Sequence, residues 1–384
     1  MSVTAPRGFR ASGVTAGLKA SGKPDVALVV SDVVANAAAV FTTNTVQAAP
    51  VLQSRAAVAN GRLRAVVLNS GGANACTGAP GRADAATMAT ATATHLGCDA
   101  TDVAVASTGL IGVALPMDRV VPGIAAAHHA LTATGGPEAA RAIMTTDSVP
   151  KEAVRSANGV TVGGMAKGAG MLAPALATML VVLTTDAEVA PDDLDTALRA
   201  ATAATFDRID ADGCMSTNDS VYVLANAASG VAPSLTVFQA LLTQVCNDLA
   251  TQLIDDAEGA SKRIEVTVGG AATEADALAA ARAVARSALL KCAVHGEDPN
   301  WGRVLAAIGT TEAAFDPERV GVSINGAEVC RDGTAYGDLD AARTAMKTRE
   351  VAISVSLNAG SATATVLTTD LTAAYVHENS AYST

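Results

Sequence analysis

Two short segments of the sequence imitate sites that bind phosphate or calcium. Gly17 to Pro24 follows the phosphate-loop pattern G-x-x-x-x-G-K, but Pro24 stands where the magnesium-binding hydroxyl should be. Arg208 to Asp219 resembles a calcium loop with Gly213 at its sixth position, but Arg208 takes the first ligand position and would repel the ion. We therefore expect no nucleotide and no metal at these segments.

The histidines and cysteines offer no better catalytic pattern. His128 and His129 are adjacent, so on a helix their side chains point about 100° apart and cannot share a ligand on one face. The six cysteines are scattered singly, without a C-x-x-C pair. Cys214 and Cys292 have polar neighbours, but a cysteine nucleophile also needs an organised base. We expect all six to be reduced thiols in the core.

A lysine and several glycines lead into an apolar run in the middle of the chain. Glycines at 163, 164, 168 and 170 surround Lys167 and predict a loop, and the run from Thr178 to Thr185 predicts a strand buried on both faces. Gly168 to Thr185 carries no charge, but its glycines, its proline and its threonines argue against a membrane helix. A lysine at the entrance of a buried strand is unusual for a purely structural segment.

The elements that must position these residues alternate irregularly along the chain. Runs of β-branched residues predict strands at 26–30, 39–43, 65–68, 103–107, 160–163, 178–184, 221–225, 264–268, 320–324, 351–357 and 363–368. Amphipathic patterns predict helices at 82–96, 118–131, 191–204, 234–257, 274–289 and 338–347. Because the last strands come in adjacent pairs, the pattern favours an α+β fold with mixed or antiparallel sheets under helices.

Composition restricts the compartment and the partners. With 384 residues, 50% hydrophobic and 16% charged, the chain can bury one large core or two ordinary ones and is not disordered. The net charge of −11 repels nucleic acid and anionic lipid. The N-terminus has no apolar stretch after its charges, as a secretory signal would. We expect a cytoplasmic protein that binds neither nucleic acid nor a membrane.

Ordered motifs extend along nearly the whole chain, and the central one is Ala177-Thr178-Met-Leu. The other segments are Gly8-Phe9 with Gly13-Val14 and Gly17-Leu18-Lys19, Val40 to Val51, Asn69 to Gly78, Ser107 to Gly112, Met144-Thr-Thr-Asp147, Asp212 to Asp219, Glu258-Gly259-Ala260, Asp298 to Arg303 and Asn379 to Thr384. In this order, the motifs resemble the ornithine acetyltransferase family, the glutamate N-acetyltransferases of arginine biosynthesis. The central motif resembles the site at which precursors of this family cleave themselves.

The resemblance implies a self-cleaving enzyme with an N-terminal nucleophile. The family fold is a layered α/β/β/α sandwich of mixed or antiparallel sheets, as in the superfamily that also contains the DmpA enzyme. Cleavage between Ala177 and Thr178 would give an α chain (1–177) and a β chain (178–384), which together form one intertwined catalytic unit. Relatives also imply an assembly of two α and two β chains.

The resemblance also assigns the catalytic groups. Thr178 is the nucleophile, and its freed α-amino group, with an ordinary pKa near 7.7 to 8.0, can accept the hydroxyl proton. Thr108, through its side chain, and Gly109, through its backbone N–H, would stabilise the oxyanion. Taken alone, Thr108-Gly109 also fits an ordinary turn at the end of a strand.

The substrate-binding residues rest on the same resemblance. Lys167 would contact a carboxylate or the acetyl oxygen, and Glu258 would contact the ornithine ammonium or the α-amino nitrogen. Without the family pattern, Lys167 also fits a solvated loop lysine and Glu258 a carboxylate at a helix end. The remaining members of the implied substrate site are Thr145 or Thr146, Asn379 and Thr384.

The implied reaction moves the acetyl group of N2-acetylornithine to glutamate by a ping-pong route through acetyl-Thr178. It needs no cofactor, although acetyl-CoA is a possible second acetyl donor. A self-cleaving amidohydrolase or aminopeptidase would use the same nucleophile with water as acceptor. A third alternative is an inactive scaffold, which predicts an uncleaved chain.

Overall fold

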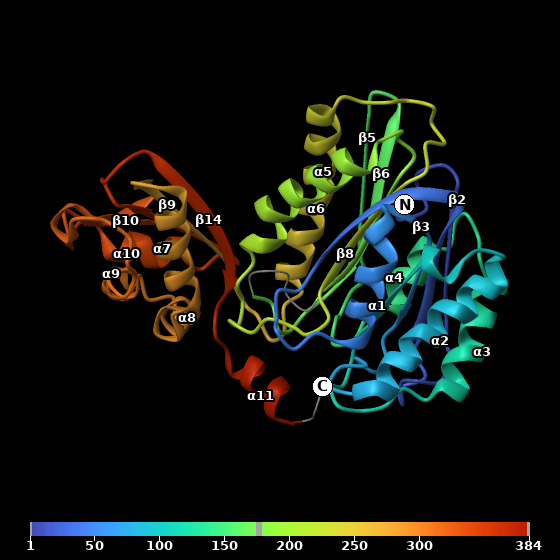
Figure 1. Cartoon of the computed structure of the whole chain (residues 1–384). Helices are drawn as coiled ribbons and strands as arrows, with labels where there is room; N and C mark the ends of the chain where they lie inside the picture. Colours follow the sequence, from blue (N-terminus) through green and yellow to red (C-terminus); the bar gives the residue numbers. More distant parts are fainter. Residues whose placement is uncertain (1, 174–178, 382–384) are drawn as a thin grey trace. The chain divides into compact units, whose positions relative to one another are not determined.

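The computed structural model describes residues 2–173 and 179–381, so Ala177, Thr178 and Thr384 lie outside the described residues. The described chain divides into two compact units, the first with residues 2–207 and 214–256 and the second with 208–213 and 257–381. The predicted fragment boundary at residue 177 therefore falls inside the first unit. Figure 1 shows the elements of both units.

The first unit is built on an eight-stranded sheet. Its strands follow the order β4-β3-β2-β8-β7-β6-β5, with β1 paired to β2. Two neighbouring pairs, β3 with β4 and β7 with β8, are parallel, and the others are antiparallel. The strands are β1 (Phe9–Val14), β2 (Val26–Phe41), β3 (Arg62–Asn69), β4 (Val103–Ser107), β5 (Lys151–Ala157), β6 (Val160–Lys167), β7 (Leu180–Thr185) and β8 (Ser220–Ala225).

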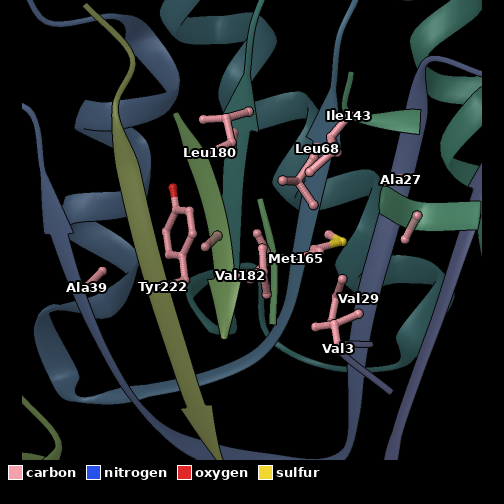
Figure 2. Close-up of a cluster of buried hydrophobic side chains, with 14 of the residues drawn as sticks. Val3, Ala27, Val29, Ala39, Leu68, Ile143, Met165, Leu180, Val182 and Tyr222 are labelled. Atoms are coloured by element: carbon pink, nitrogen blue, oxygen red, sulfur yellow. The ribbon is translucent and has the colours of Figure 1, made fainter. Parts of the chain in front are cut away.

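Alternating residues of this sheet belong to two different hydrophobic clusters. Leu28 of β2 clusters with Met88 of α2 and Ile124 of α3, whereas its neighbour Val29 belongs to a second cluster with Ile143, next to α4. Figure 2 shows Val29 and Ile143 in that second cluster, together with Tyr222. The helices are α1 (Ala49–Ala57), α2 (Gly78–Leu96), α3 (Met117–His129), α4 (Gly136–Ala142), α5 (Pro191–Ala204) and α6 (Leu235–Asp255).

Two strands of the first unit differ from the sequence prediction. The strands predicted at 26–30 and 39–43 fall in the single strand β2, which ends at Phe41 and whose register shifts between Val30 and Ala35. At this irregularity, Asp32 and Val33 are exposed, whereas residues 26–31 before them are buried. The strand predicted at 160–163 continues to Lys167, so the expectation of a loop around residues 163 and 164 was wrong.

The second unit contains a six-stranded sheet with strand order β12-β11-β10-β13-β9-β14. Among its described strand pairs, only β13 with β9 is parallel. Val266 of β9, Ile353 of β13 and Ala281 of α7 share its hydrophobic core. Its strands are β9 (Arg263–Ala271), β10 (Gly321–Ile324), β11 (Ala327–Arg331), β12 (Thr334–Ala335), β13 (Glu350–Ser356) and β14 (Ala362–Thr369).

The helices of the second unit include a break that the sequence pattern did not show. The helix predicted at 274–289 is divided at Ser287, whose extended backbone ends one helix and whose hydroxyl accepts from Leu290 N–H to begin the next. The helices are α7 (Glu274–Arg286), α8 (Ala288–His295), α9 (Trp301–Ile308), α10 (Leu339–Ala345) and α11 (Ala373–Ala381). Short 3-10 helices are η1 (Val58–Asn60), η2 (Ala100–Asp102), η3 (Phe206–Arg208) and η4 (Pro317–Arg319).

The structure confirms the predicted α+β class, with mixed and mostly antiparallel sheets. Every residue of β7 is buried, as its apolar run predicted. No helix in residues 2–173 and 179–381 combines the length and the apolar character needed to cross a membrane. Strand β7 lies between β6 and β8, so the predicted α and β chains contribute neighbouring strands to one sheet.

Candidate active site

The turn after β4 presents Thr108 and Gly109. The N–H of Thr108 donates to the Asn69 carbonyl (3.0 Å), and the Thr108 carbonyl accepts from Gly72 N–H (3.1 Å). Gly109 has φ +128°, and a Cβ at this position would lie 2.7 Å from the nitrogen of Gly72. Only glycine fits this backbone conformation and this close approach. Among the described residues, the N–H of Gly109 donates to no other group, so it is available to an oxyanion.

Buried amide side chains hold this turn in place. Asn69 Nδ2 donates to the Gly72 carbonyl (3.0 Å), and the Ser107 hydroxyl donates to Asn69 Oδ1 (2.5 Å). From the segment before β8, Asn218 Nδ2 donates to the carbonyls of Ser107 (2.8 Å) and Ala73 (2.7 Å). Since all these groups are buried, the turn is rigidly defined by its hydrogen bonds.

Lys167 lies beside Thr108 and is not a solvated lysine. It is the last residue of β6, its side chain is 2% exposed, and its Nζ lies 3.2 Å from Thr108 Oγ1. Because an ammonium can only donate, Thr108 Oγ1 accepts this bond and keeps its own proton to donate elsewhere. The structure thus brings together three predicted site residues, Thr108, Gly109 and Lys167.

A buried carboxylate that the sequence reading did not single out supports Lys167. Asp147 Oδ2 lies 4.0 Å from Lys167 Nζ, and Asp147 Oδ1 accepts from Lys151 Nζ (2.6 Å) and from Gly168 N–H (2.7 Å). Burial alone would raise the pKa of Asp147, but the charges of Lys167 and Lys151 outweigh it and lower the pKa to about 2. Its position in the Met144-Thr-Thr-Asp147 motif was the only sequence signal for this role.

Asp147 also fixes the loop that carries Thr145 and Thr146. The N–H of Thr145 donates to Asp147 Oδ2 (2.9 Å), and both threonines are half-buried between α4 and β5. Lys151 Nζ continues the network to Asp256 Oδ2 (2.6 Å), which also accepts from Ser148 N–H (3.0 Å). Of the two predicted threonines, Thr145 therefore shares a carboxylate with Lys167.

The structure predicts a pH-dependent contribution of Asp147 to stability. Its folded-state pKa of about 2 lies below the ordinary 3.8, so the contribution is fully present above pH 3.8 and disappears as the pH falls through 2. This pKa shift corresponds to a contribution of about 2 kcal/mol from Asp147 to the free energy of unfolding. Asp147→Asn should lower the urea midpoint at pH 7, and the difference from the native protein should shrink as the pH falls through this range.

The matched control is Asp195→Asn, which removes a carboxylate from the exposed Asp195–Arg199 pair of α5. Because exposed ion pairs contribute little, its midpoint should stay close to that of the native protein. Equal urea midpoints for native protein and Asp147→Asn at pH 7 would contradict the predicted contribution.

The segment that imitates a phosphate loop has a structural role next to this network. Asp25 accepts from the N–H groups of Ala16, Leu18 and Lys19 at 2.6 to 3.1 Å, so these donors are not free for phosphate. Lys19 Nζ donates to the carbonyls of Pro24 (2.8 Å) and Met144 (2.7 Å). Burial lowers the pKa of Lys19 to about 8, and the charge of Lys167 adds to this while Asp25 and Asp147 oppose it. The matching motif Gly17-Leu18-Lys19 was the only sequence signal for this role of Lys19.

In the second unit, the structure joins two other predicted residues. Asn379 of α11 donates from Nδ2 to Glu258 Oε2 (3.0 Å), although they are 121 positions apart in the sequence. Gly259, with φ +61°, packs so closely on the start of α11 that a Cβ would lie 2.2 Å from the nitrogen of Tyr375. Glu258 is therefore not merely a free carboxylate at a helix end.

The entrance to β7 is held by the segment before β8. Met179 N–H donates to Asp219 Oδ1 (2.9 Å), and the Met179 carbonyl accepts from Ser220 N–H (3.1 Å). Leu180 is the register partner of both Lys167 and Ser220, so this entrance lies at the Lys167 end of β6. The predicted residues Ala177, Thr178 and Thr384 lie outside the described residues. In the sequence, Asp219 was noted only as the last residue of the segment that imitates a calcium loop and of the matching segment Asp212 to Asp219.

No group of three or more histidine, cysteine, aspartate or glutamate side chains arranged to hold a metal occurs among the described residues. All six cysteines are free thiols, but only Cys246 and Cys330 are buried, and the expectation of core thiols was wrong for the exposed Cys76, Cys214 and Cys292. The chemistry that the site offers is a buried hydroxyl, a backbone N–H and a buried cation, arranged around one turn. Such groups can stabilise the oxyanion formed when an acyl group is transferred.

Comparison with known proteins agrees with this chemistry. The sequence matches the ArgJ family over residues 10–384. It is 59% identical over 385 residues to the arginine biosynthesis bifunctional protein ArgJ of Thermobifida fusca and 60% identical over 384 residues to that of Streptomyces avermitilis, with 100% of each chain covered. The fold, the site and these matches define an acyltransferase.

A solved structure extends the comparison. The arginine biosynthesis bifunctional protein argJ of Bacillus halodurans is 36% identical, with a TM-score of 0.50, and the match covers 52% of this chain and 97% of that chain. The solved chain is thus about half as long as this one. The protein belongs to the ArgJ family.

Proposed function

We propose that this acyltransferase moves the acetyl group of N2-acetylornithine to glutamate in arginine biosynthesis, through an acetyl-Thr178 intermediate. The observation that carries the proposal is the turn at Thr108 and Gly109, with Lys167 Nζ 3.2 Å from the Thr108 hydroxyl. The full-length relatives named as bifunctional proteins of arginine biosynthesis support the reaction and the pathway.

Thr178 acts twice as a nucleophile, and the first attack, on its own chain, creates the α-amine that serves as the base in acetyl transfer. Its hydroxyl attacks the Ala177 carbonyl, the C–N bond to Thr178 breaks, and the nitrogen takes a proton to become the free α-amine. Water then releases the Ala177 carboxylate from the ester. The neutral α-amine, with an ordinary pKa near 7.7 to 8.0, can accept the hydroxyl proton in the transfer reaction.

In the first half-reaction, the Thr178 hydroxyl attacks the acetyl carbonyl of N2-acetylornithine. The α-amine of Thr178 takes the hydroxyl proton and returns it to the leaving nitrogen, so that ornithine departs and acetyl-Thr178 remains. In the second half-reaction, the amino group of glutamate attacks this ester and restores the hydroxyl. Both tetrahedral intermediates carry an oxyanion, which Thr108 Oγ1 and Gly109 N–H stabilise by donation.

Lys167 acts beside the oxyanion. Its ammonium donates to Thr108 Oγ1, which orients the Thr108 proton away from the lysine and toward the acyl oxygen. Its buried positive charge also favours the negative charge that develops there. The carboxylate of Asp147, 4.0 Å from Lys167 Nζ, compensates the positive charge of the lysine throughout the transfer.

The remaining residues bind the two amino-acid substrates. Thr145 or Thr146, on the loop fixed by Asp147, binds a polar group of the substrate. Glu258, oriented by Asn379, attracts the ornithine ammonium or the α-amino nitrogen, and Thr384 completes this group. No cofactor is required, and acetyl-CoA serves as a second acetyl donor in the proposal, in keeping with the bifunctional names of the relatives.

We further propose that residues 1–177 and 178–384 are separate chains in the mature cytoplasmic enzyme, which contains two of each. The half-length chain of the Bacillus halodurans structure supports this division. The pairing of β6 with β7 supports it as well, because these hydrogen bonds cross the cut and keep the fragments in one sheet.

The test follows labelled acetyl from N2-acetylornithine with and without glutamate. Labelled N-acetylglutamate should form, ornithine should be released, and the two substrates should give the parallel-line kinetics of a ping-pong reaction. If glutamate neither receives the label nor accelerates the loss of acetyl, and free acetate accumulates, the protein is instead an amidohydrolase with the same nucleophile.

A further inference from the structure

One short segment contacts both halves of the proposed catalytic apparatus. Asn218 donates from its side chain to the Ser107 carbonyl (2.8 Å), next to the Thr108-Gly109 turn. Its neighbour Asp219 accepts from the N–H of Met179 (2.9 Å), the residue that directly follows Thr178 in the chain. Two consecutive side chains thus connect the oxyanion turn with the backbone that carries the nucleophile.

We propose that Asn218 and Asp219 are positioning residues that set the location of the nucleophile relative to the oxyanion turn, both for self-cleavage and for acetyl transfer. This inference rests on the proposed function, because it presupposes Thr178 as the nucleophile. It assigns Asp219 the Thr178 side of the site and Asn218 the Thr108 side.

The backbone of Met179 is held at both of its polar groups. Besides the bond from its N–H to Asp219, its carbonyl accepts from Ser220 N–H (3.1 Å). The segment is itself fixed, since the Asp219 carbonyl accepts from Thr42 N–H (2.9 Å) and Ser220 Oγ donates to the Asn218 carbonyl (2.9 Å). Met179 N is bonded directly to the carbonyl carbon of Thr178, so this clamp restrains the nucleophile's own peptide unit.

The environment of Asp219 indicates how its carboxyl group works. The side chain is fully buried, and its Oδ2 has no hydrogen-bond partner among the described residues. Burial raises the pKa of Asp219 well above its ordinary value, while the Met179 N–H and the charge of Lys167 oppose this shift. The carboxyl group accepts through Oδ1, and because burial favours its protonated form, that form can donate through Oδ2.

Asparagine has nearly the same shape as aspartate, and its amide oxygen can accept the bond from Met179 N–H in the place of Asp219 Oδ1. Asp219→Asn should therefore keep self-cleavage and keep kcat within about tenfold of the native value, with the same pH profile. Asp219→Ala frees the Met179 N–H, and a misplacement of about 1 Å typically reduces the rate by about 10²-fold. We expect that loss in kcat and in the rate of self-cleavage, with KM for N2-acetylornithine nearly unchanged.

A matched control comes from the other end of the same strand. Asp186 follows β7, is 2% exposed, and accepts backbone N–H bonds from Arg7 (3.3 Å) and Thr161 (2.8 Å). Asp186→Ala removes a comparable buried carboxyl group far along β7 from residue 179. It should lower the melting temperature at least as much as Asp219→Ala does, but it should leave kcat close to the native value.

Native protein is assayed first, because absence of acetyl transfer there would refute the proposed function and not the positioning role. With an active native enzyme, native-like kcat in Asp219→Ala overturns the inference. So does an equal loss of kcat in Asp186→Ala and Asp219→Ala, which would indicate general destabilisation. Should Asp219→Ala not fold, Asp219→Asn decides: native activity with an unchanged pH profile supports positioning, and loss of activity overturns it.

The Asn218 side of the segment is tested independently. Asn218→Ala removes the donor to the Ser107 carbonyl and should lower kcat for transfer, with little change in KM. Because the variant acts through the oxyanion turn, combining it with Thr108→Val should cost less than the product of the two separate effects. Fully multiplicative effects would show that Asn218 does not act through Thr108.

Discussion

Thr178→Ala should remain a single uncleaved polypeptide and should show no acetyl transfer. The hydroxyl is the atom that attacks both the Ala177 carbonyl and the substrate acetyl group in the proposed mechanism, and removing it leaves nothing to carry the acetyl group. The expected loss is at least about 10⁴-fold in kcat, the scale found when a covalent nucleophile is removed. Denaturing electrophoresis and the labelled-acetyl assay measure the two effects on one preparation.

The matched control for this variant is Thr178→Ser, which keeps the hydroxyl and the α-amine and removes one methyl group. It should cleave itself and transfer acetyl, at a reduced rate. Cleavage of Thr178→Ala at Ala177 would show that another residue is the nucleophile. Activity of the intact Thr178→Ala chain would show that transfer does not depend on cleavage.

Thr108→Val should lower kcat by about 10² to 10³-fold, the usual effect of removing one donor to an oxyanion. Valine has the same shape as threonine but cannot donate, and it leaves Lys167 without the acceptor that lies 3.2 Å away. Because the oxyanion exists only in the tetrahedral intermediates, KM for N2-acetylornithine should change little. Steady-state kinetics on the cleaved enzyme separate the two parameters.

Thr92→Val is the control for the loss of a buried threonine hydroxyl. Thr92 lies in α2, is fully buried, and donates to the Met88 carbonyl in the same helix (2.9 Å). The kcat of the Thr92→Val enzyme should equal that of the native enzyme. A Thr108→Val enzyme with native kcat, or with only KM raised, would remove Thr108 from the oxyanion site.

Long, strongly patterned elements could be predicted from the sequence. The helix predicted at 191–204 agrees with α5 (Pro191–Ala204), where proline and two aspartates mark the first turn. The short helices α1, α4 and α9 were missed, because segments of seven to nine residues span only about two turns, too few for a helical period to be recognised. Strand β1 was missed as well, since Phe9–Val14 contains polar residues and forms its ladder only by pairing with β2.

The candidate site was predictable only in part, because some of its residues act through partners that are distant in the sequence. The resemblance pointed to Thr108, Lys167, Glu258 and Asn379, and the structure places them in two contacting pairs, although their catalytic roles stay predictions. Asp147 and Asp219 could not be assigned in advance. Their roles depend on burial and on partners about 20 to 40 positions away, such as Lys167, Gly168 and Met179, which no local pattern reveals.

The most direct test of the central claim is the intact mass of the purified native protein before and after incubation with N2-acetylornithine. We predict two polypeptides of 177 and 207 residues (384 − 177), of which only the longer one gains a single acetyl group, carried on its first residue. A fully active enzyme with the mass of one 384-residue chain, or an acetyl group on any other side chain, would contradict the claim.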